Sequence, residues 1–310
     1  MIAGLPEPLA DLCYYRMQRH FGGLRNPTPV KQIVAGCRLA QAIQQHRPLT
    51  GARVLEVGSG RSLAMPLLMW LLGAERTLTV DLNRYLRPEL VRADLAYLQA
   101  QQAWLWDQLA PVAGDADLTS ERLGDLLALD LERPAARVLE DVLRSCGIDC
   151  RAPADASALD LADDSIDVQL SRAVLEHVPP DDMERILREA ARVLKPDGLC
   201  AHLIDPSDHF QHSDPSISRV NFLRFSEAEW ERLAGNRFMY MNRLRASDYL
   251  SLFAEAGLEV LDVNSVVDEE SRLLIESGGL PLDEGFTGKT VEDLATTELL
   301  LVARPAATGA

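Results

Sequence analysis

Single acidic residues follow short apolar segments of this sequence, where they could do chemistry. Glu56 stands two residues before the turn Gly58-Ser59-Gly60, and Asp81 follows Gly60 by 21 residues. A carboxylate at the end of a buried segment needs a partner, and the ammonium group of a ligand would suit Glu56. Asp81 offers two oxygens that can accept hydrogen bonds from a ribose diol. The spacing therefore indicates a small-molecule site beside a glycine turn.

A second group of polar residues lies in the segment 205–214, DPSDHFQHSD, which holds two histidines and three carboxylates. A histidine paired with an aspartate is a suitable base near neutral pH. His209 is our first candidate for taking a proton from a substrate, with Asp205 or Asp208 orienting it. His212 is the second candidate. A solvated polar loop is the alternative without chemistry.

A divalent metal ion is another interpretation of the same segment. Carboxylates and imidazoles supply the oxygen and nitrogen ligands that such ions use. The spacing matches no fixed metal-binding loop, so we expect no metal here, although an ion that holds vicinal hydroxyls is not excluded. The residues that could contribute are Asp205, Asp208, His209, His212 and Asp214.

Short apolar segments that alternate with helical ones must position these residues. Such alternation is typical of an α/β fold with a parallel, doubly wound sheet, which binds ligands beyond the carboxyl ends of its strands. The predicted strands are Arg53–Val57, Thr77–Val80, Cys150–Pro153, Ile166–Leu170, Leu199–Ile204, Leu258–Val263 and Glu298–Ala303.

The stretch between Asp81 and Asp155 is longer than one helical crossover requires. Apolar residues at helical spacing indicate helices in it, so we predict a helical insertion over about residues 84–145, between the second and third strands. We expect it to cover the ligand cleft or to form a dimer contact, with a simple packing cap as the alternative. Residues 1–50 are predicted to form N-terminal helices that precede a domain over 51–305.

Composition limits the partners of the chain. Its 310 residues carry a formal net charge of −16, which disfavours a broad nucleic-acid surface. No apolar run is long enough to span a bilayer, and the first residues lack the pattern of a signal peptide. Five scattered cysteines suit reduced thiols rather than a disulfide framework. We therefore expect a cytoplasmic protein.

Five motifs occur together in a characteristic order: LEVGSG from Leu55, VDL from Val80, DASALDLADDSIDV from Asp155, LEHV from Leu175 and LREAARVLKPDG from Leu187. In this series the sequence resembles the class I S-adenosylmethionine-dependent methyltransferases, in particular the methyltransferase type 11-like group. The resemblance covers residues 53 to about 205 apart from the insertion. It implies a Rossmann-like, seven-stranded sheet in the order 3-2-1-4-5-7-6 with the last strand antiparallel, and S-adenosylmethionine as cofactor.

The resemblance also assigns roles around that cofactor. Glu56 would hold the methionine ammonium group, and the glycine turn would pass under the methionine part. Asp81 would bind the ribose hydroxyls, and Leu82 would lie against the adenine. The roles of the remaining residues would be as follows: Asp155 accepts from the adenine amino group, the N–H of Ala156 bonds a ring nitrogen, and Ser171 and Arg172 flank the sulfonium.

The expected reaction is O-methylation of a hydroxyl group by base-assisted direct displacement, leaving S-adenosylhomocysteine. We favour a carbohydrate or a glycan or glycolipid precursor as acceptor. A natural-product hydroxyl or amine is the alternative acceptor, and a non-catalytic protein that keeps the cofactor fold is the alternative class. His177, in the LEHV motif, is a further candidate base. Leu63 stands where a dinucleotide fingerprint needs its third glycine, which disfavours a dehydrogenase. The sequence leaves open whether the protein forms a homodimer.

Overall fold

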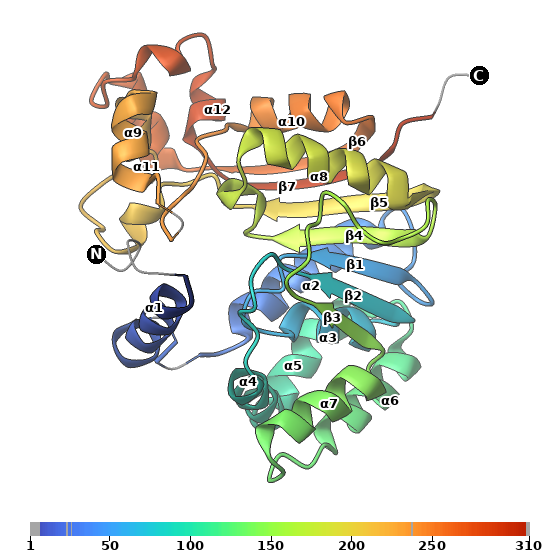
Figure 1. Cartoon of the computed structure of the whole chain (residues 1–310). Helices are drawn as coiled ribbons and strands as arrows, with labels where there is room; N and C mark the ends of the chain where they lie inside the picture. The colour runs from blue at the N-terminus through green and yellow to red at the C-terminus, as the bar shows by residue number, and fades with distance from the viewer. Residues whose placement is uncertain (1–6, 23, 26, 237, 308–310) are drawn as a thin grey trace.

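Seven strands form one sheet in the order β3-β2-β1-β4-β5-β7-β6 within the described residues of this computed structural model, which are 7–22, 24–25, 27–236 and 238–307. Strands β1 to β5 pair in parallel, and β7 runs antiparallel to both of its neighbours (Figure 1). The predicted Rossmann-like order is thus confirmed. The strands are β1 (Arg53–Val57), β2 (Arg76–Val80), β3 (Ile148–Arg151), β4 (Ile166–Arg172), β5 (Leu194–Ile204), β6 (Leu258–Val267) and β7 (Thr296–Pro305).

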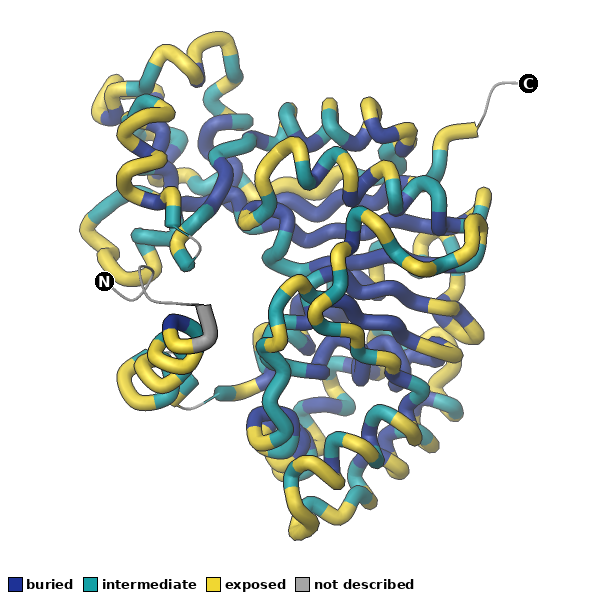
Figure 2. Tube along the Cα trace, viewed as in Figure 1, coloured by how far each residue is buried: buried dark blue, intermediate teal, exposed yellow. Residues whose placement is uncertain are grey.

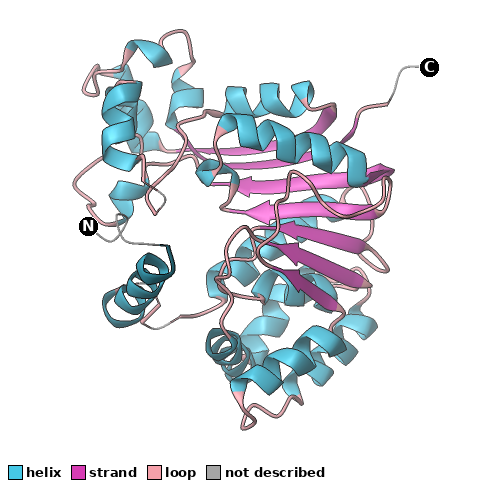
Figure 3. Ribbon diagram, viewed as in Figure 1, coloured by secondary structure: helices cyan, strands magenta, loops and turns pink. Residues whose placement is uncertain are grey.

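Helices cover both faces of the sheet, which makes three layers (Figure 3). The central strands are buried on both sides, and successive residues of a strand face opposite layers. In β1, Val54 joins the core beneath α2 (Val30–Gln44) and α3 (Ala64–Leu71), whereas Leu55 joins the core beneath α8 (Pro180–Val193) and α10 (Ala246–Glu255). This alternation decides which side chains of a strand can reach a ligand.

The predicted insertion consists of helices that extend the α2–α3 layer past the outer strand β3. Its buried leucines and valines pack into the same core as α2 and α3, and α4 packs against α7. None of its helices contributes a residue to the lining of the large cavity described below, but Tyr85, near the start of the predicted insertion, does line it. That the insertion covers the cleft stays a prediction. A dimer contact stays a prediction. The helices are α4 (Pro88–Ala100), α5 (Gln102–Leu109), α6 (Ala116–Leu127) and α7 (Ala135–Ser145).

One helix and a separate group of helices lie at the end of the sheet toward which β4 and β5 point (Figure 1). One is α1 (Glu7–Phe21), whose outer face is largely exposed in Figure 2. The other has its own apolar core around Phe222, Trp230 and Phe286. Its helices are α9 (Glu227–Ala234), α11 (Glu269–Glu276) and α12 (Val291–Ala295). Of the predicted N-terminal helical region, residues 1–6, 23 and 26 lie outside the described residues.

The third strand lies earlier than predicted. Gly147, with a φ of 60°, ends the preceding helix, and the strand then begins at once at Ile148 and ends at Arg151. Pro153, which we placed in the strand, lacks the N–H that a ladder needs and falls in the following loop. Asp155 is therefore on a loop beyond the strand rather than at its end. No helix among the described residues is long and apolar enough to cross a membrane.

Candidate functional site

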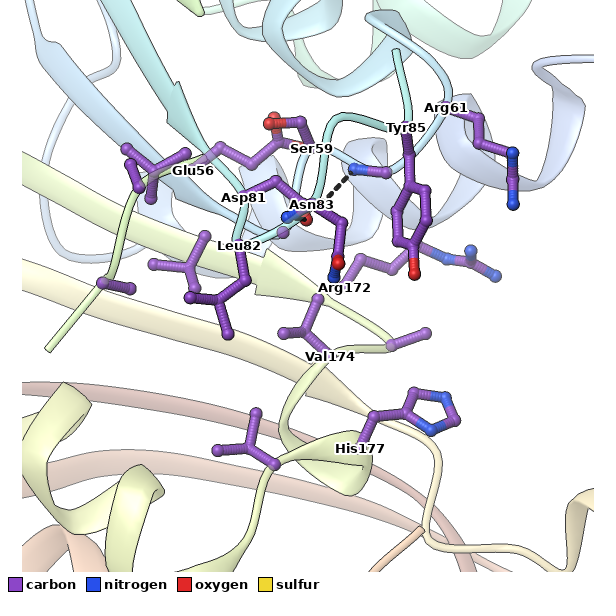
Figure 4. A pocket seen from close by; sticks show the side chains of 18 of the residues that line it. Glu56, Ser59, Arg61, Asp81, Leu82, Asn83, Tyr85, Arg172, Val174 and His177 are labelled. Carbon is purple, nitrogen blue, oxygen red and sulfur yellow. Dashed lines mark hydrogen bonds between the residues drawn. The ribbon is translucent and has the colours of Figure 1, made fainter. Parts of the chain in front are cut away.

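A cavity of about 570 Å³ opens where β1, β2 and β4 end (Figure 4). β1 and β4 are neighbouring parallel strands whose following helices, α3 and α8, belong to opposite layers. The chain therefore diverges between them and leaves a crevice, which is the ligand-binding place of an open α/β sheet. The turns that follow the three strands supply most of the lining, and α1 and the segment around Phe238 close one side.

The glycine turn after β1 lies very close to the side chain of Val174. Gly58 has a φ of 86°, and a Cβ added to it would lie 2.4 Å from Cγ2 of Val174. Gly60 has a φ of 58°, and nothing lies within 4 Å of the place where a Cβ would stand. Such φ values favour glycine because a side chain is strained there. The turn consequently presents bare backbone to the cavity.

Asp81 is held rigidly at the end of β2. Its Oδ2 accepts a hydrogen bond from the N–H of Gly60 at 2.9 Å, and its Oδ1 accepts one from the N–H of Asn83 at 2.7 Å. Each carboxylate oxygen keeps a further lone pair, so the group can still accept from a ligand diol. The adjacent Leu82 is 66% exposed and lines the same cavity, which is open apolar surface for a flat ring.

Glu56 is a buried acid that lines the cavity from β1. It is 6% exposed, and its Oε2 accepts a hydrogen bond from the hydroxyl of Thr79. Burial raises the pKa of Glu56 to about 8; the Thr79 bond opposes this rise and the Asp81 charge adds to it. A carboxylate in such a place gains from a cationic partner, so a ligand ammonium group would stabilise its charged form.

Asp155, Ala156 and Arg172 also line the cavity, as their predicted roles require. Oδ1 of Asp155 accepts two bonds from Ser157, from its N–H and its hydroxyl, each at 2.8 Å, and these lower the pKa of Asp155. Ser171 is different: it is fully buried, and its hydroxyl lies 2.7 Å from Nδ1 of His202 inside the sheet. The Ser171 side chain therefore does not line the cavity, and the predicted place of Ser171 beside a sulfonium stays a prediction.

A second, smaller cavity of about 260 Å³ adjoins the first at the end of β4, and both are lined by Arg172 and Ala173. Eight of its twelve lining residues carry polar side chains. Asp205 and His212, two of the candidate catalytic residues, are among them. The polar loop after β5 thus opens on the same crevice as the glycine turn.

The candidate histidines come together between the two cavities. The ring centroids of His177 and His209 are 5.0 Å apart, as are those of His209 and His212. Oδ2 of Asp205 lies 3.6 Å from Nε2 of His209 and 4.0 Å from Nε2 of His212. These are ion-pair distances rather than hydrogen bonds, so the expected aspartate–histidine pair is close but not bonded. Asp208 instead accepts from the N–H of Phe210 at 2.9 Å.

The three histidines differ in which cavity their side chains reach. His177 lines the large cavity and His212 lines the small one, whereas His209 lines neither and lies between them. Burial lowers the pKa of His209 to about 4, while the Asp205 charge opposes that change. Burial therefore favours the neutral form of the His209 imidazole. His177 is the histidine that a ligand of the large cavity would meet.

One family model matches part of the sequence. The family model for a methyltransferase domain matches residues 112–202, a segment that contains β4, the LEHV motif and most of β5. The matched segment belongs to the same seven-stranded sheet as the glycine turn after β1. This match agrees with the resemblance of the sequence to the class I S-adenosylmethionine-dependent methyltransferases. No curated protein matches its sequence.

Several solved structures are similar to this chain at low identity. A putative sarcosine dimethylglycine methyltransferase from Galdieria sulphuraria is 17% identical, with 88% of this chain and 85% of that one covered and a TM-score of 0.46. A putative methyltransferase from Bacillus halodurans C-125 is 15% identical, with 86% and 98% covered and a TM-score of 0.44. A protein from Pyrococcus horikoshii OT3 is 13% identical, with 87% and 90% covered and a TM-score of 0.47.

The residues of the large cavity fit S-adenosylmethionine, the cofactor that the family resemblance implies. A Cβ at Gly58 would collide with Val174, so the turn requires glycine, and the open side of Gly60 leaves room beside the backbone. The buried Glu56 carboxyl would become the anion that a methionine ammonium group needs, and Asp81 would offer diol acceptors. An apolar cleft with a few convergent polar groups is the usual form of a cofactor site.

Some lining residues of the large cavity were not singled out from the sequence. Tyr14 of α1 stacks on Phe238, with ring centroids 4.6 Å apart, and both line the large cavity. Arg61 lies over the ring of Tyr85 at 4.8 Å. The carbonyl of Tyr240 accepts from Nδ1 of His177 at 2.9 Å. No local pattern of residue types marks Tyr14, Arg61 or Tyr85 as lining residues.

Proposed function

We propose that this methyltransferase methylates a hydroxyl oxygen of a carbohydrate or of a glycan or glycolipid precursor. The observation that carries the proposal is the junction of the two cavities at Arg172 and Ala173, where a cofactor-type cavity adjoins a polar one. A donor in the first and an acceptor in the second would meet at that junction. Holding two reactants in line in this way is the main demand of a displacement reaction.

The chain's own residues would hold the donor along the ends of three strands. Glu56 pairs with the ammonium group, Asp81 accepts from the ribose hydroxyls, and Asp155 accepts from the adenine amino group. When bound, S-adenosylmethionine supplies a methyl group that its sulfonium already activates. Arg172 belongs to both cavities, so it would stand beside the reacting groups and help to exclude water.

His177 would face the acceptor hydroxyl, because it lines the large cavity next to Val174 and Tyr240. The Tyr240 carbonyl accepts from its Nδ1, which leaves Nε2 as the atom that can take or hold a proton. The centroid of the His209 ring lies 5.0 Å from that of the His177 ring, and the Asp205 carboxylate lies 3.6 Å from Nε2 of His209. We propose that this group of side chains removes the hydroxyl proton.

The polar cavity favours an acceptor with several hydroxyl groups. Its lining includes Ser207, Gln211 and Arg219, which can donate to or accept from sugar oxygens. Carboxylates at Asp205 and Glu298 add acceptors on the same wall. A flat apolar acceptor would leave these groups without partners, at a cost in binding free energy.

A natural-product hydroxyl or amine is the second candidate acceptor, and aromatic side chains favour it. Tyr14, Tyr85, Phe238 and Tyr240 line the large cavity, and such rings bind flat molecules and cationic amines. The five cysteines are all free thiols, which suits the cytoplasmic location that we propose.

Incubation of the purified protein with methyl-labelled S-adenosylmethionine and a panel of acceptors tests the proposal. The panel contains nucleotide sugars, oligosaccharides and glycolipid precursors, together with phenols and amines of similar size. Label is expected in the carbohydrate group, with S-adenosylhomocysteine formed in equal amount. Label confined to phenols or amines would establish the second candidate, and cofactor binding without transfer to any acceptor class would favour a non-catalytic role.

A further inference from the structure

Three potential metal ligands converge between β4 and β5. Glu176 and His177 lie in the 3₁₀ turn Leu175–His177 that follows β4, and His209 begins the 3₁₀ turn after β5. One ligand atom from each of these three side chains lies within 4.8 Å of the other two. The two strands are parallel neighbours, so their carboxyl ends bring residues 33 positions apart into one cluster.

The buried carboxyl group of Glu176 lacks hydrogen-bond partners within the described part of the protein. It is fully buried, and neither carboxylate oxygen has a hydrogen-bond partner of ordinary geometry among the described residues. The backbone N–H groups of Glu176 and Asp205 come close enough to favour its charged form without reaching that geometry. An unpaired buried carboxyl destabilises the fold unless something compensates it. Its neighbours in the cluster are two imidazoles, which also have lone pairs to offer.

The two imidazoles are oriented as metal ligands usually are. Nδ1 of His177 donates to the carbonyl of Tyr240, which fixes the tautomer and leaves the lone pair on Nε2. Nε2 of His209 is buried and has no hydrogen-bond partner within the described part of the chain, although Oδ2 of Asp205 lies 3.6 Å from it. The side chain of Asn242 secures the turn by donating to the carbonyls of Leu175 and Val178, at 2.7 and 2.9 Å.

We propose that Glu176, His177 and His209 bind a divalent transition-metal cation, with Asp205 placed to complete the ligand set. Ligand atoms about 2.1 Å from a tetrahedral ion are roughly 3.4 Å apart, so small side-chain rotations would close the present spacing. Two imidazole nitrogens with carboxylate oxygens suit Zn²⁺ or Fe²⁺ rather than Mg²⁺ or Ca²⁺. Asp208 and Asp214, which the sequence offered as ligands, are not part of the cluster, and their Oδ1 atoms accept from the N–H groups of Phe210 and Ser216.

The place of this cluster suggests what the cation does, an assignment that rests on the proposed function. The cluster adjoins both cavities, through His177 on one side and Asp205 on the other. A hydroxyl that binds the cation becomes a stronger acid. With the cation bound, His177 is a ligand and no longer the base. The O–H bond would then break with transfer of the proton to the ring of His212, which is 56% exposed and is not one of the three ligands. The oxygen is then ready to accept a methyl group.

Metal binding by the full chain, prepared without a histidine tag and stripped with a chelator, tests the proposal. Co²⁺ is the spectroscopic probe, because its visible bands report the ligand number, and Zn²⁺ affinity follows from competition with a chromophoric chelator. One equivalent is expected to bind. Glu176→Gln, His177→Ala and His209→Ala should each weaken binding at least about tenfold. The matched control is His46→Ala, since His46 pairs with Asp262 away from both cavities.

The same preparations separate this inference from the proposed function. Titration with S-adenosylmethionine shows whether each variant is folded, since the three ligands are not expected to contact its ammonium or ribose groups. Failure of the stripped wild-type chain to bind Co²⁺ or Zn²⁺ would overturn the metal site, while methyl transfer by that metal-free chain would leave the proposed function intact. Undiminished metal affinity in both His177→Ala and His209→Ala would also overturn it. Absence of cofactor binding in the wild type would instead refute the proposed function.

Discussion

The N–H of Gly60 donates a hydrogen bond of 2.9 Å to Oδ2 of Asp81, and this bond ties the turn after β1 to the end of β2. The two residues are 21 positions apart and lie on neighbouring parallel strands. The bond fixes both the backbone that passes under a ligand and the carboxylate that would receive its diol. Cofactor affinity should therefore depend on Asp81 more than on any exposed acid nearby.

We expect Asp81→Ala to weaken the binding of S-adenosylmethionine by about 1–3 kcal/mol, because it removes charge-assisted hydrogen bonds. Isothermal titration measures the change. Asp160→Ala is the matched control, since Asp160 is exposed and lines neither cavity. Denaturant unfolding of the free protein shows how much of the effect comes from a loosened turn. Unchanged affinity in Asp81→Ala would refute the ribose assignment.

Gly58→Ala should abolish or strongly reduce cofactor binding. A methyl group there would lie 2.4 Å from Val174, and the φ of 86° adds strain of about 1–2 kcal/mol. The double variant Gly58→Ala, Val174→Ala removes the collision but not the strain, so partial recovery of affinity is expected. If the single variant binds as the wild type does, the turn is not shaped by this contact.

Cofactor affinity should rise with pH because of Glu56. Burial holds its pKa at about 8 in the free protein, and an ammonium partner favours the charged form. Binding below about pH 8 must therefore release a proton, and affinity should increase by up to about tenfold per pH unit between about pH 6 and pH 7.5. Above that window an amino group of the ligand begins to lose its own charge.

Titration calorimetry in buffers of different ionisation enthalpy counts that proton. Glu56→Gln is the control, since an amide cannot titrate and its affinity should vary little over the same range. Binding to the wild type with no proton release would show that Glu56 is already charged or does not meet the ammonium group.

His177→Ala and His209→Ala should each lower the rate of methyl transfer about 10²–10⁴-fold while cofactor affinity stays nearly constant. His177 lines the large cavity, and the ring of His209 packs against the ring of His177. Single-turnover kinetics with an identified acceptor make the comparison, with His46→Ala as the variant expected to keep wild-type activity. Full activity in both variants would leave the histidine cluster without a part in the reaction.

Tyr14→Ala should weaken ligand binding in the large cavity by about 0.5–1.5 kcal/mol, because Tyr14 stacks on Phe238 at 4.6 Å across its open side. A cycle with Phe238→Ala isolates the contribution of the pair. Additive effects of the two substitutions would mean that the stacking does not help to close the cavity.

The sequence by itself determined the strand alternation and the residues at the strand ends. Glu56, Gly58 and Asp81 are placed by short local patterns, in which a buried strand must end in a turn and the turn must bear polar groups. The same patterns gave the sheet class and the position of the insertion. The third strand was misplaced because a four-residue strand beside Gly147 and Pro153 carries little periodic signal.

Only the tertiary structure decided which of these side chains meet. Ser171 and Arg172 are consecutive, yet the pleat turns Ser171 toward His202 and leaves Arg172 in both cavities. Glu176 looks in the sequence like any acid of a surface turn, and it became a ligand candidate because folding buries it beside His209. Contacts of this kind join distant parts of the chain through burial and packing. A local pattern of residue types cannot encode them, since it specifies which elements form but not which side chains those elements bring together.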